Sequence, residues 1–375
     1  MDFLNGGKLV ESPVDLPQIQ DAETLYIDFE TSSGHPKKTS FNPWHNCFIA
    51  GLAITYDDCP TSWYIPDAQL DQDWLKDVLV GPKTWVNHNI KYDAHVLKNQ
   101  RGLEFAGELY DTMTMAKLVY SDFFSYSLDN LGKVWLPDSF RKIGNILEAY
   151  TKKSKDYGDV PVEVMGEYAC QDVRATRALH NYIENRMPDE SRGVQTVEMG
   201  LTKVLFEIEQ AGMCISAKTE LELKTMEYKW GTKILNLQKE IEQELRESGH
   251  WDLMVDFEPH NNRHCLQLLI ESYHMPVLKH TENGNPSFNK DTLAEYERLS
   301  NAPKELIKKI REFRKLWTLN NLFVEKYIQL NVDGKLHASY NQSVRTGRMS
   351  CSDPNLQQLD LKSKSFIIPD PGMAF

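Results

Sequence analysis

An apolar run that ends in two carboxylates constrains this chain most. The run Leu25–Thr31 reads Leu-Tyr-Ile-Asp-Phe-Glu-Thr, which is typical of a buried strand with Asp28 and Glu30 near its C-terminal end. Residues i and i+2 of a strand project from the same face, so both carboxylates point the same way. Adjacent anions repel unless a cation lies between them, and hard oxygen ligands suit Mg²⁺ or Mn²⁺. Two solvated carboxylates at a strand end are the plain alternative.

Length and composition restrict the class of protein. With 375 residues, of which 41% are hydrophobic, the chain is long enough for two or three domains. It contains no apolar run of membrane-spanning length and no signal-peptide pattern, so we expect no membrane partner. Its six cysteines are scattered, which favours a reduced, cytoplasmic setting without a zinc site. The net charge of −12 argues against a basic, nucleic-acid-coating surface, although metal ions and local basic patches can still contact phosphates.

The pattern of strands and helices predicts an α/β fold. Residues 1–22 are polar and interrupted by Gly and Pro, which favours a loose lead-in. Strands precede alternating helices and strands, which favours a mixed sheet with helices on its faces. The predicted strands are Thr24–Glu30, Phe48–Tyr56, Ser62–Pro66 and Lys83–Asn87, and the predicted helices are Gln72–Val80, Ile90–Gln100, Thr112–Tyr120 and Gly166–His180.

Two further pairs of polar residues lie four apart on predicted helices. Asn89 is an expected N-cap, and Asp93 lies one turn into the helix that follows. Tyr168 and Asp172 share a face of the helix Gly166–His180. A capped helix with a solvated Asp, and a core aromatic beside a surface Asp, are the plain alternatives.

In this order, Asp-x-Glu, Asn-x3-Asp and Tyr-x3-Asp resemble the three motifs of the proofreading 3′→5′ exonuclease domain of the DNA polymerase I family, or family A. The match is to the type with a Tyr in its third motif, and Tyr110–Met113 and Ser127–Leu131 resemble connecting segments of that domain. The resemblance implies a ribonuclease H-like, mixed-sheet exonuclease domain over residues 23–192.

The resemblance also implies a two-metal mechanism with Mg²⁺ or Mn²⁺. Asp28, Glu30 and Asp172 would hold one ion, and Asp28 would share a second ion with Asp93. Two such ions can activate water and stabilise the leaving 3′-oxygen. Tyr168 would orient the water, because a phenol with a pKa near 10 is a poor base. The residues expected to contact the frayed strand are Thr31, Asn89, Lys91 and Tyr92.

Beyond the exonuclease, the chain resembles the polymerase body. Residues 193–333 resemble a mainly α-helical thumb that starts with the helix and turn Leu201–Met213. We expect a long amphipathic helix over Lys218–Glu247, with Leu221, Leu235, Ile241 and Leu245 among its apolar positions. The remaining expected helices are two small ones within Phe257–Glu271 and Asp291–Arg298 and a long antiparallel one, Pro303–Leu330.

Residues 334–375 resemble the first part of the polymerase palm. The string from Thr346 to Gln358 carries the closest match, and it implies that Arg348 and Gln357 bind primer–template DNA in the minor groove, with Arg345 and Asn355 beside them. Minor-groove acceptors are shared by all base pairs, so such contacts test shape without reading sequence. Residues 303–348 hold ten basic and four acidic side chains. This excess favours duplex contact, with a solvated helix face as the alternative.

The later palm and fingers motifs of the family cannot be found in this chain. We therefore expect no polymerase activity from it alone, and a second polypeptide, supplied through a split or interrupted gene or required because of truncation, to complete the palm and fingers. The predicted function is the proofreading 3′→5′ exonuclease portion of a bacterial or phage-encoded family A polymerase. Two alternatives stay open: a stand-alone ribonuclease, which needs no thumb, and a non-catalytic DNA-binding subunit, which needs no intact carboxylate set.

Overall fold

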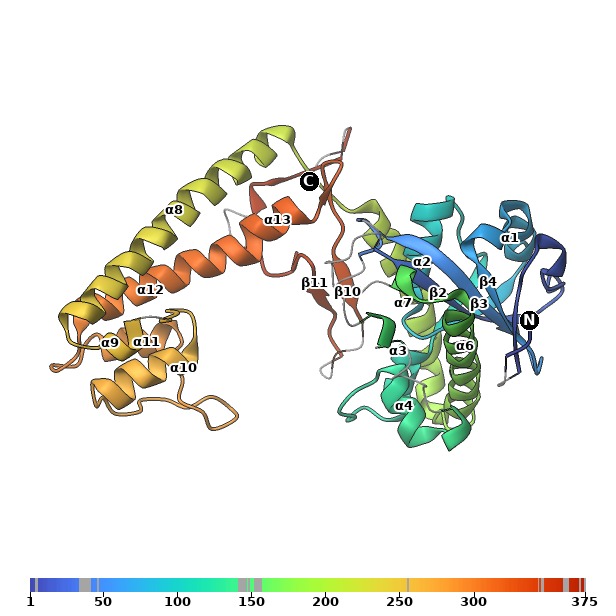
Figure 1. Ribbon diagram of the computed structural model, residues 1–375, viewed down its shortest axis with the longest axis horizontal. Coiled ribbons are helices and arrows are strands. Elements are labelled where there is room, and N and C mark those ends of the chain that lie inside the picture. The colour runs from blue at the N-terminus through green and yellow to red at the C-terminus, as the bar shows by residue number, and fades with distance from the viewer. Residues whose placement is uncertain are drawn as a thin grey trace. The chain divides into compact units, whose positions relative to one another are not determined.

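The computed structural model divides into two compact units (Figure 1). The first comprises Met1–Gly212 and Ser339–Cys351, and the second comprises Met213–Ala338 and Ser352–Phe375. The structure describes residues 1–3, 6–33, 42–45, 47–140, 147, 149–151, 157–254, 256–342, 344, 347–359, 364–370 and 372–373. The division at Gly212 differs from the predicted boundary after residue 192, and a segment of the predicted palm belongs to the first unit.

A six-stranded mixed sheet forms the centre of the first unit. Its order is β1-β4-β3-β2-β5-β6, with β2 antiparallel to β3 and parallel to β5. The sheet confirms the predicted fold class, and β3, β4 and β5 have the predicted bounds. The strands are β1 (Gly7–Leu9), β2 (Thr24–Ser32), β3 (Phe48–Tyr56), β4 (Ser62–Pro66), β5 (Lys83–Asn87) and β6 (Gly107–Asp111).

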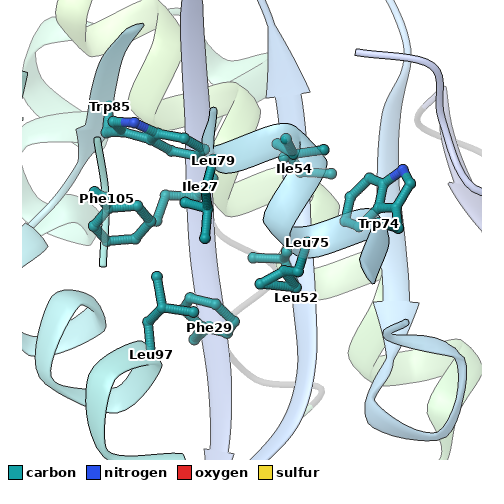
Figure 2. A pocket seen from close by; sticks show the side chains of 11 residues that line it. Ile27, Phe29, Leu52, Ile54, Trp74, Leu75, Leu79, Trp85, Leu97 and Phe105 are labelled. Atoms are coloured by element: carbon teal, nitrogen blue, oxygen red, sulfur yellow. The ribbon is translucent and has the colours of Figure 1, made fainter. Parts of the chain in front are cut away.

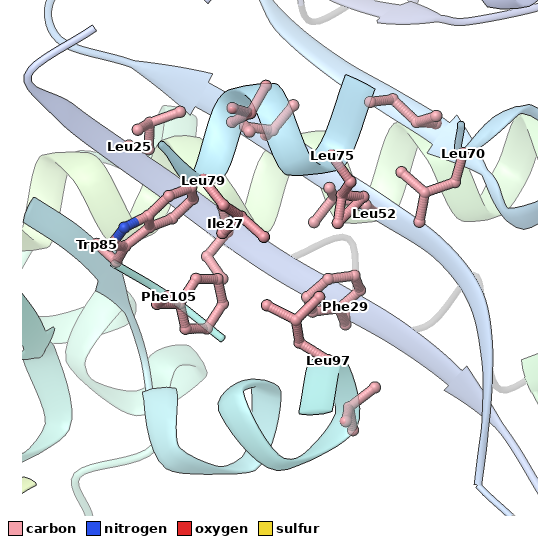
Figure 3. Packing of buried hydrophobic residues seen from close by; sticks show 14 of the residues in the cluster. Leu25, Ile27, Phe29, Leu52, Leu70, Leu75, Leu79, Trp85, Leu97 and Phe105 are labelled. Carbon is pink, nitrogen blue, oxygen red and sulfur yellow. The ribbon is translucent and has the colours of Figure 1, made fainter. Parts of the chain in front are cut away.

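Helices pack on both faces of this sheet, as its two-sided burial requires. On one face Leu25, Ile27 and Phe29 of β2 join a core with side chains of α1 and α2 (Figure 3). On the other face Tyr26 packs with Leu179 of α6. The helices of this unit are α1 (Gln72–Leu79), α2 (Ile90–Arg101), α3 (Thr112–Val119), α4 (Leu128–Trp135), α6 (Val162–Glu184) and α7 (Arg192–Ala211).

A small cavity lies within the core on the α1 side of β2 (Figure 2). Ile27, Phe29, Leu52, Trp74 and Trp85 are among its lining residues, and all of the lining side chains are hydrophobic. Its volume is about 10 Å³, which is hardly enough for one water molecule. The cavity is therefore a packing defect rather than a ligand pocket.

The prediction of a loose lead-in over residues 1–22 was wrong. Strand β1 pairs with β4 in parallel, and Val10 and Ile19 are buried in the core. A three-residue strand is too short to show a recognisable alternation in the sequence. Its partner strand also lies more than fifty residues away, so no local turn signal links the two.

Two long helices, α8 (Ala217–Glu247) and α12 (Lys304–Leu319), lie side by side in the second unit (Figure 1). Leu237, Ile241 and Leu245 pack in one core with Leu306 and Ile310 of α12. Of the four apolar positions named in the sequence for this helix, Ile241 and Leu245 are buried, whereas Leu221 and Leu235 are exposed. The smaller elements are α9 (Trp251–Met254), α10 (Asn262–Leu266), the π-helical turn Gln267–Ser272, α11 (Lys290–Tyr296), the π-helical turn Asn320–Val324 and α13 (Glu325–Gln329).

A four-stranded sheet completes the second unit, in the order β12-β7-β9-β8. The strands are β7 (Met213–Ile215), β8 (Asn331–Val332), β9 (Lys335–Leu336) and β12 (Ile367–Ile368). A separate two-stranded ribbon pairs β10 (Ser339–Asn341) with β11 (Ser350–Ser352). In the part of the chain that the structure describes, no helix is both long and apolar enough to cross a membrane.

Candidate active site

Strand β2 directs its two acidic side chains away from the α1 core. Leu25, Ile27 and Phe29 occupy that core, so the alternate residues Asp28 and Glu30 face helix α6. Glu30 is buried, and Asp28 is half-buried. The ladder between β2 and β3 shifts register immediately after Glu30. Such an irregularity re-aims side chains at the edge of a site.

Helix α6 presents Tyr168 and Asp172 to the same region. Asp172 is buried, and Tyr168 is half-buried. Burial raises the pKa of the Tyr168 phenol first, and the negative charges of Asp172, Glu30 and Asp28 raise it further. These causes place three of the four predicted carboxylates within electrostatic reach of one hydroxyl group. They also keep that hydroxyl protonated at neutral pH.

Asp93 lies in the first turn of α2 and is almost fully buried. Its Oδ1 accepts a hydrogen bond from the backbone N–H of Phe29 on β2 at 2.8 Å. Burial raises the pKa of Asp93 well above its ordinary value, and the nearby charge of Asp28 adds to this, against hydrogen bonds that lower it. The fourth carboxylate is thus tied to the strand that carries the first two.

Close packing behind the carboxylates leaves little freedom on the α6 face. Gly51 of β3 is opposite Glu30, and a Cβ at Gly51 would lie 2.4 Å from the Tyr64 ring. A Cβ at Gly166 of α6 would lie 3.0 Å from that ring. Two glycines are therefore what lets the Tyr64 ring fit between β3 and α6.

Three carboxylates whose charges act on one phenol, with Asp93 hydrogen-bonded to the strand that carries two of them, match the chemistry of a divalent cation site. The repulsion between Asp28 and Asp93 is the kind of interaction that a bound cation offsets. Among the described residues, however, no three acidic, His or Cys side chains are grouped closely enough to hold a metal ion. The donor set fits Mg²⁺ or Mn²⁺ by chemistry, and the expected two-ion geometry stays a prediction.

The residues predicted to contact a frayed strand differ in their surroundings. Asn89 is exposed with a left-handed backbone, and it occupies the cap position of α2 without the predicted side-chain capping bond. Thr31 is buried, and its Oγ1 lies 2.9 Å from the Tyr92 hydroxyl. Lys91 is turned inward and forms a buried ion pair with Glu209 at 2.5 Å. Only Asn89 among these is exposed.

The residues predicted to bind primer–template DNA are divided between the two units. Arg348 is exposed in the segment that joins the first unit, whereas Asn355 and Gln357 belong to the second unit. Asn355 Oδ1 accepts a hydrogen bond from the Gln357 N–H at 3.1 Å. Arg345 lies outside the described residues.

Much of the basic charge between residues 303 and 348 has acidic or carbonyl partners. Arg314 donates to the Pro259 carbonyl at 2.6 Å and to the carbonyl oxygens of Phe288 and His260. Ion pairs therefore offset part of the positive charge that the sequence suggested for duplex contact. The other paired residues are Lys308 with Glu305, Lys309 with Glu244, Arg311 with Glu297, Lys326 with Asp353 and Lys335 with Asp370.

Two acidic residues were missed by the sequence analysis. Asp111 caps α3 by accepting from Met113 N–H at 2.9 Å, and it also accepts from Asn89 N–H at 2.9 Å. Glu209 of α7 binds Lys91 and also His95, both on α2. Burial acts to raise the pKa of Glu209, but the His95 hydrogen bond and the Lys91 charge outweigh it and lower the pKa. Only the Asp before Thr112 carried a local capping signal.

Two family models match the chain, one in each half. Residues 16–188 match a family model described as 3′-5′ exonuclease, and residues 220–368 match one described as DNA polymerase family A. The chain belongs to DNA polymerase family A. It carries the 3′-5′ exonuclease domain of that family and part of its polymerase domain.

Relatives from bacteria and phages extend over most of this family A chain. It is 28% identical to DNA polymerase I of Pseudomonas aeruginosa, covering 93% of this chain and 38% of that protein. It is 25% identical to DNA polymerase DpoZ of Salmonella phage PMBT28, covering 95% of this chain and 59% of that protein. The chain thus spans about two fifths to three fifths of the length of these relatives.

A solved structure shares the fold. It is the POL domain of Pol1 from M. smegmatis in complex with DNA primer-template and dNTP, with a TM-score of 0.64 and 18% sequence identity. The match covers 95% of this chain and 56% of that one. At this identity the likeness supports the fold alone.

Proposed function

We propose that the first unit removes nucleotides from the 3′ end of DNA, releasing one nucleoside monophosphate at a time. The observation that supports this most is that the charges of Asp28, Glu30 and Asp172 all act on the Tyr168 hydroxyl, while Asp93 is hydrogen-bonded to the strand that carries Asp28 and Glu30. These residues lie in the region that matches the 3′-5′ exonuclease family.

The carboxylates are proposed to hold two divalent ions, Mg²⁺ or Mn²⁺. Asp28, Glu30 and Asp172 would hold one, and Asp28 and Asp93 would hold the other. Bound there, such ions lower the pKa of water and stabilise the charge on a leaving oxygen. Asp93 would contribute a ligand whose position is set by the Phe29 N–H.

Tyr168 is proposed to position the attacking water rather than to accept its proton. Its raised pKa means that the phenol is protonated throughout the physiological pH range. A neutral hydroxyl can both donate and accept a hydrogen bond, so it can fix the orientation of a water molecule. Loss of the hydroxyl would therefore slow the reaction without abolishing it.

DNA is the proposed partner of both units. Asn89 is exposed at the start of α2 and is the best placed of the predicted residues to touch a frayed strand. Thr31 and Tyr92, whose hydroxyl groups are hydrogen-bonded to each other, would line the proposed contact surface next to Asn89. Lys91 is not proposed to contact the strand, because its ammonium group forms an ion pair with Glu209. Arg348, Arg345, Asn355 and Gln357 remain proposed contacts to primer–template duplex.

Digestion of labelled DNA tests the proposal. We expect the wild-type chain to shorten a single strand and a mismatched primer in Mg²⁺ but not in EDTA. Asp28→Ala and Asp172→Ala should abolish the reaction, whereas Glu163→Ala, which removes an exposed carboxylate from the same helix α6, should retain it. Binding without digestion would favour the DNA-binding subunit. Digestion of RNA in preference to DNA would favour the ribonuclease.

Nucleotide addition is proposed to need polypeptide beyond these residues, in the same chain or in a second one. The support is that the chain spans 38% and 59% of the two relatives described above. Primer extension by these 375 residues with four deoxynucleotides should be undetectable, and measurable extension would contradict this. The bacterial cytoplasm is the proposed compartment, because the relatives are bacterial and phage proteins and none of the six cysteines, all of which the structure describes, forms a disulfide.

A further inference from the structure

Polar contacts hold helix α2 from two opposite sides. On one side Asp93 accepts the Phe29 N–H at 2.8 Å. Lys91 and His95 lie one turn apart on the other side, as residues four apart in a helix do. Lys91 Nζ lies 2.5 Å from Glu209 Oε1, and His95 Nε2 lies 2.6 Å from Glu209 Oε2. Glu209 is only 3% exposed, so a buried anion on α7 binds the helix that carries Asp93.

A backbone peptide group from the polymerase region is a further hydrogen-bond partner of the Glu209 carboxylate. The Tyr340 N–H donates to Glu209 Oε1 at 2.6 Å, and Lys91 donates to the Tyr340 carbonyl. Tyr340 lies in β10, within the residues that match the polymerase family, yet it belongs to the first unit. Both polar ends of one residue's backbone are therefore bound to the nuclease fold.

The neighbours of His95 define its hydrogen-bonding role. Gln210 Nε2 donates to His95 Nδ1 at 3.0 Å, so the ring proton is on Nε2 and points to Glu209. The rings of Trp44 and Phe206 flank the imidazole at 4.7 and 4.9 Å between centroids. The cluster thus contains one anion and one cation in a dry setting, where removal of either charge leaves the other uncompensated.

We propose that Glu209 is a positioning residue of the nuclease site. It fixes the position of helix α2, and therefore of Asp93, through its contacts with Lys91 and His95. The Tyr340 peptide is a third contact of its carboxylate. The kinetic part of the test below depends on the proposed nuclease function, and the exchange part does not.

Kinetics of the 375-residue chain provide the first readout. Glu209→Gln should lower kcat on a short single strand in Mg²⁺ at least tenfold, with KM within twofold of the wild type. Adding Lys91→Met to Glu209→Gln removes the uncompensated cation, so the double variant should have a kcat at least threefold higher than that of Glu209→Gln alone. The matched control is Gln342→Ala. Gln342 is also buried and anchors the same segment through hydrogen bonds to α7, to Glu198 Oε2 at 2.7 Å and to Thr202, rather than through Glu209. Its removal should lower the melting temperature and leave kcat within twofold.

Hydrogen exchange at the Phe29 amide provides the second readout, because Asp93 is the acceptor of that N–H. Exchange should accelerate at least tenfold in Glu209→Gln and stay at the wild-type rate in Gln342→Ala. If the wild type digests no DNA, the proposed function fails while this readout still decides the role of Glu209. If Glu209→Gln does not fold, Lys91→Met alone should show both effects to a smaller degree. Unchanged Phe29 exchange, or equal loss of kcat in both variants, would overturn the proposal.

Discussion

Gly51 is the tightest packing point next to the carboxylates, and Gly51→Ala tests how rigid that packing is. The new Cβ would lie 2.4 Å from the Tyr64 ring, where carbon atoms normally stay about 3.5 Å or more apart. The ring would have to move by roughly 1 Å, but it is 2% exposed and α6 closes the other side at Gly166. We expect a loss of about 3 kcal/mol, the upper part of the overpacking range. That corresponds to a decrease of roughly 6–12 °C in the melting temperature of the first unit.

Urea unfolding followed by tryptophan fluorescence measures this loss. The control is Gly200→Ala in α7, where an added Cβ meets no atom within 4 Å, and it should stabilise by about 0.5–1 kcal/mol. Replacing the ring by Tyr64→Leu should reduce the effect of Gly51→Ala, with a coupling energy of about 1 kcal/mol or more. A Gly51→Ala variant within about 0.5 kcal/mol of the wild type, a range typical of surface substitutions, would refute the packing argument.

Three further predictions concern single side chains. Because the pKa of Asp93 is raised in the folded state, its stabilising contribution is complete below its ordinary pKa and is lost as the pH rises through the raised value. Asp93→Asn should therefore have a larger free energy of unfolding in urea than the wild type at pH 8 in EDTA, by about 1.4 kcal/mol for each unit by which folding raises the pKa of Asp93. This difference should vanish near pH 3. An Asp93→Asn variant that is less stable than the wild type at pH 8 would contradict this. Tyr168→Phe should reduce kcat by about 10- to 100-fold and leave measurable digestion, so complete inactivity would argue for an essential proton transfer. Arg314→Met should destabilise the second unit by about 2–3 kcal/mol, because the carbonyls that Arg314 binds lose their donor, whereas Lys315→Met on the exposed side should change stability by less than about 0.5 kcal/mol in the same assay.

Elements with a strong local pattern could be predicted from the sequence. The strand Phe48–Tyr56 follows from its nearly continuous apolar run and the turn residues after it, and the start of α2 at Ile90 follows from the polar residues before it. The same holds for the shared face of Asp28 and Glu30, which depends only on the period of a strand. These predictions need no knowledge of distant parts of the chain.

Features that depend on distant partners could not be predicted. Leu221 and Leu235 look like core residues of α8, but which stripe of a helix is covered depends on the element that packs against it. Lys91 looks like a DNA contact because Lys is usually exposed, yet Glu209, 118 residues away, draws it inward. Two basic residues of α12 are likewise paired with distant acidic residues, Lys309 with Glu244 and Arg311 with Glu297.

The polarity of digestion tests the central claim most directly. A single strand labelled at its 5′ end in one sample and at its 3′ end in another is incubated with the chain in Mg²⁺. We expect the 3′ label to be released at once as a mononucleotide and the 5′ label to move down a ladder of single-nucleotide steps, and both changes to be absent with Asp28→Ala. Release of the 5′ label first, internal cuts, or an unchanged rate with Asp28→Ala would contradict a 3′→5′ exonuclease built on these carboxylates.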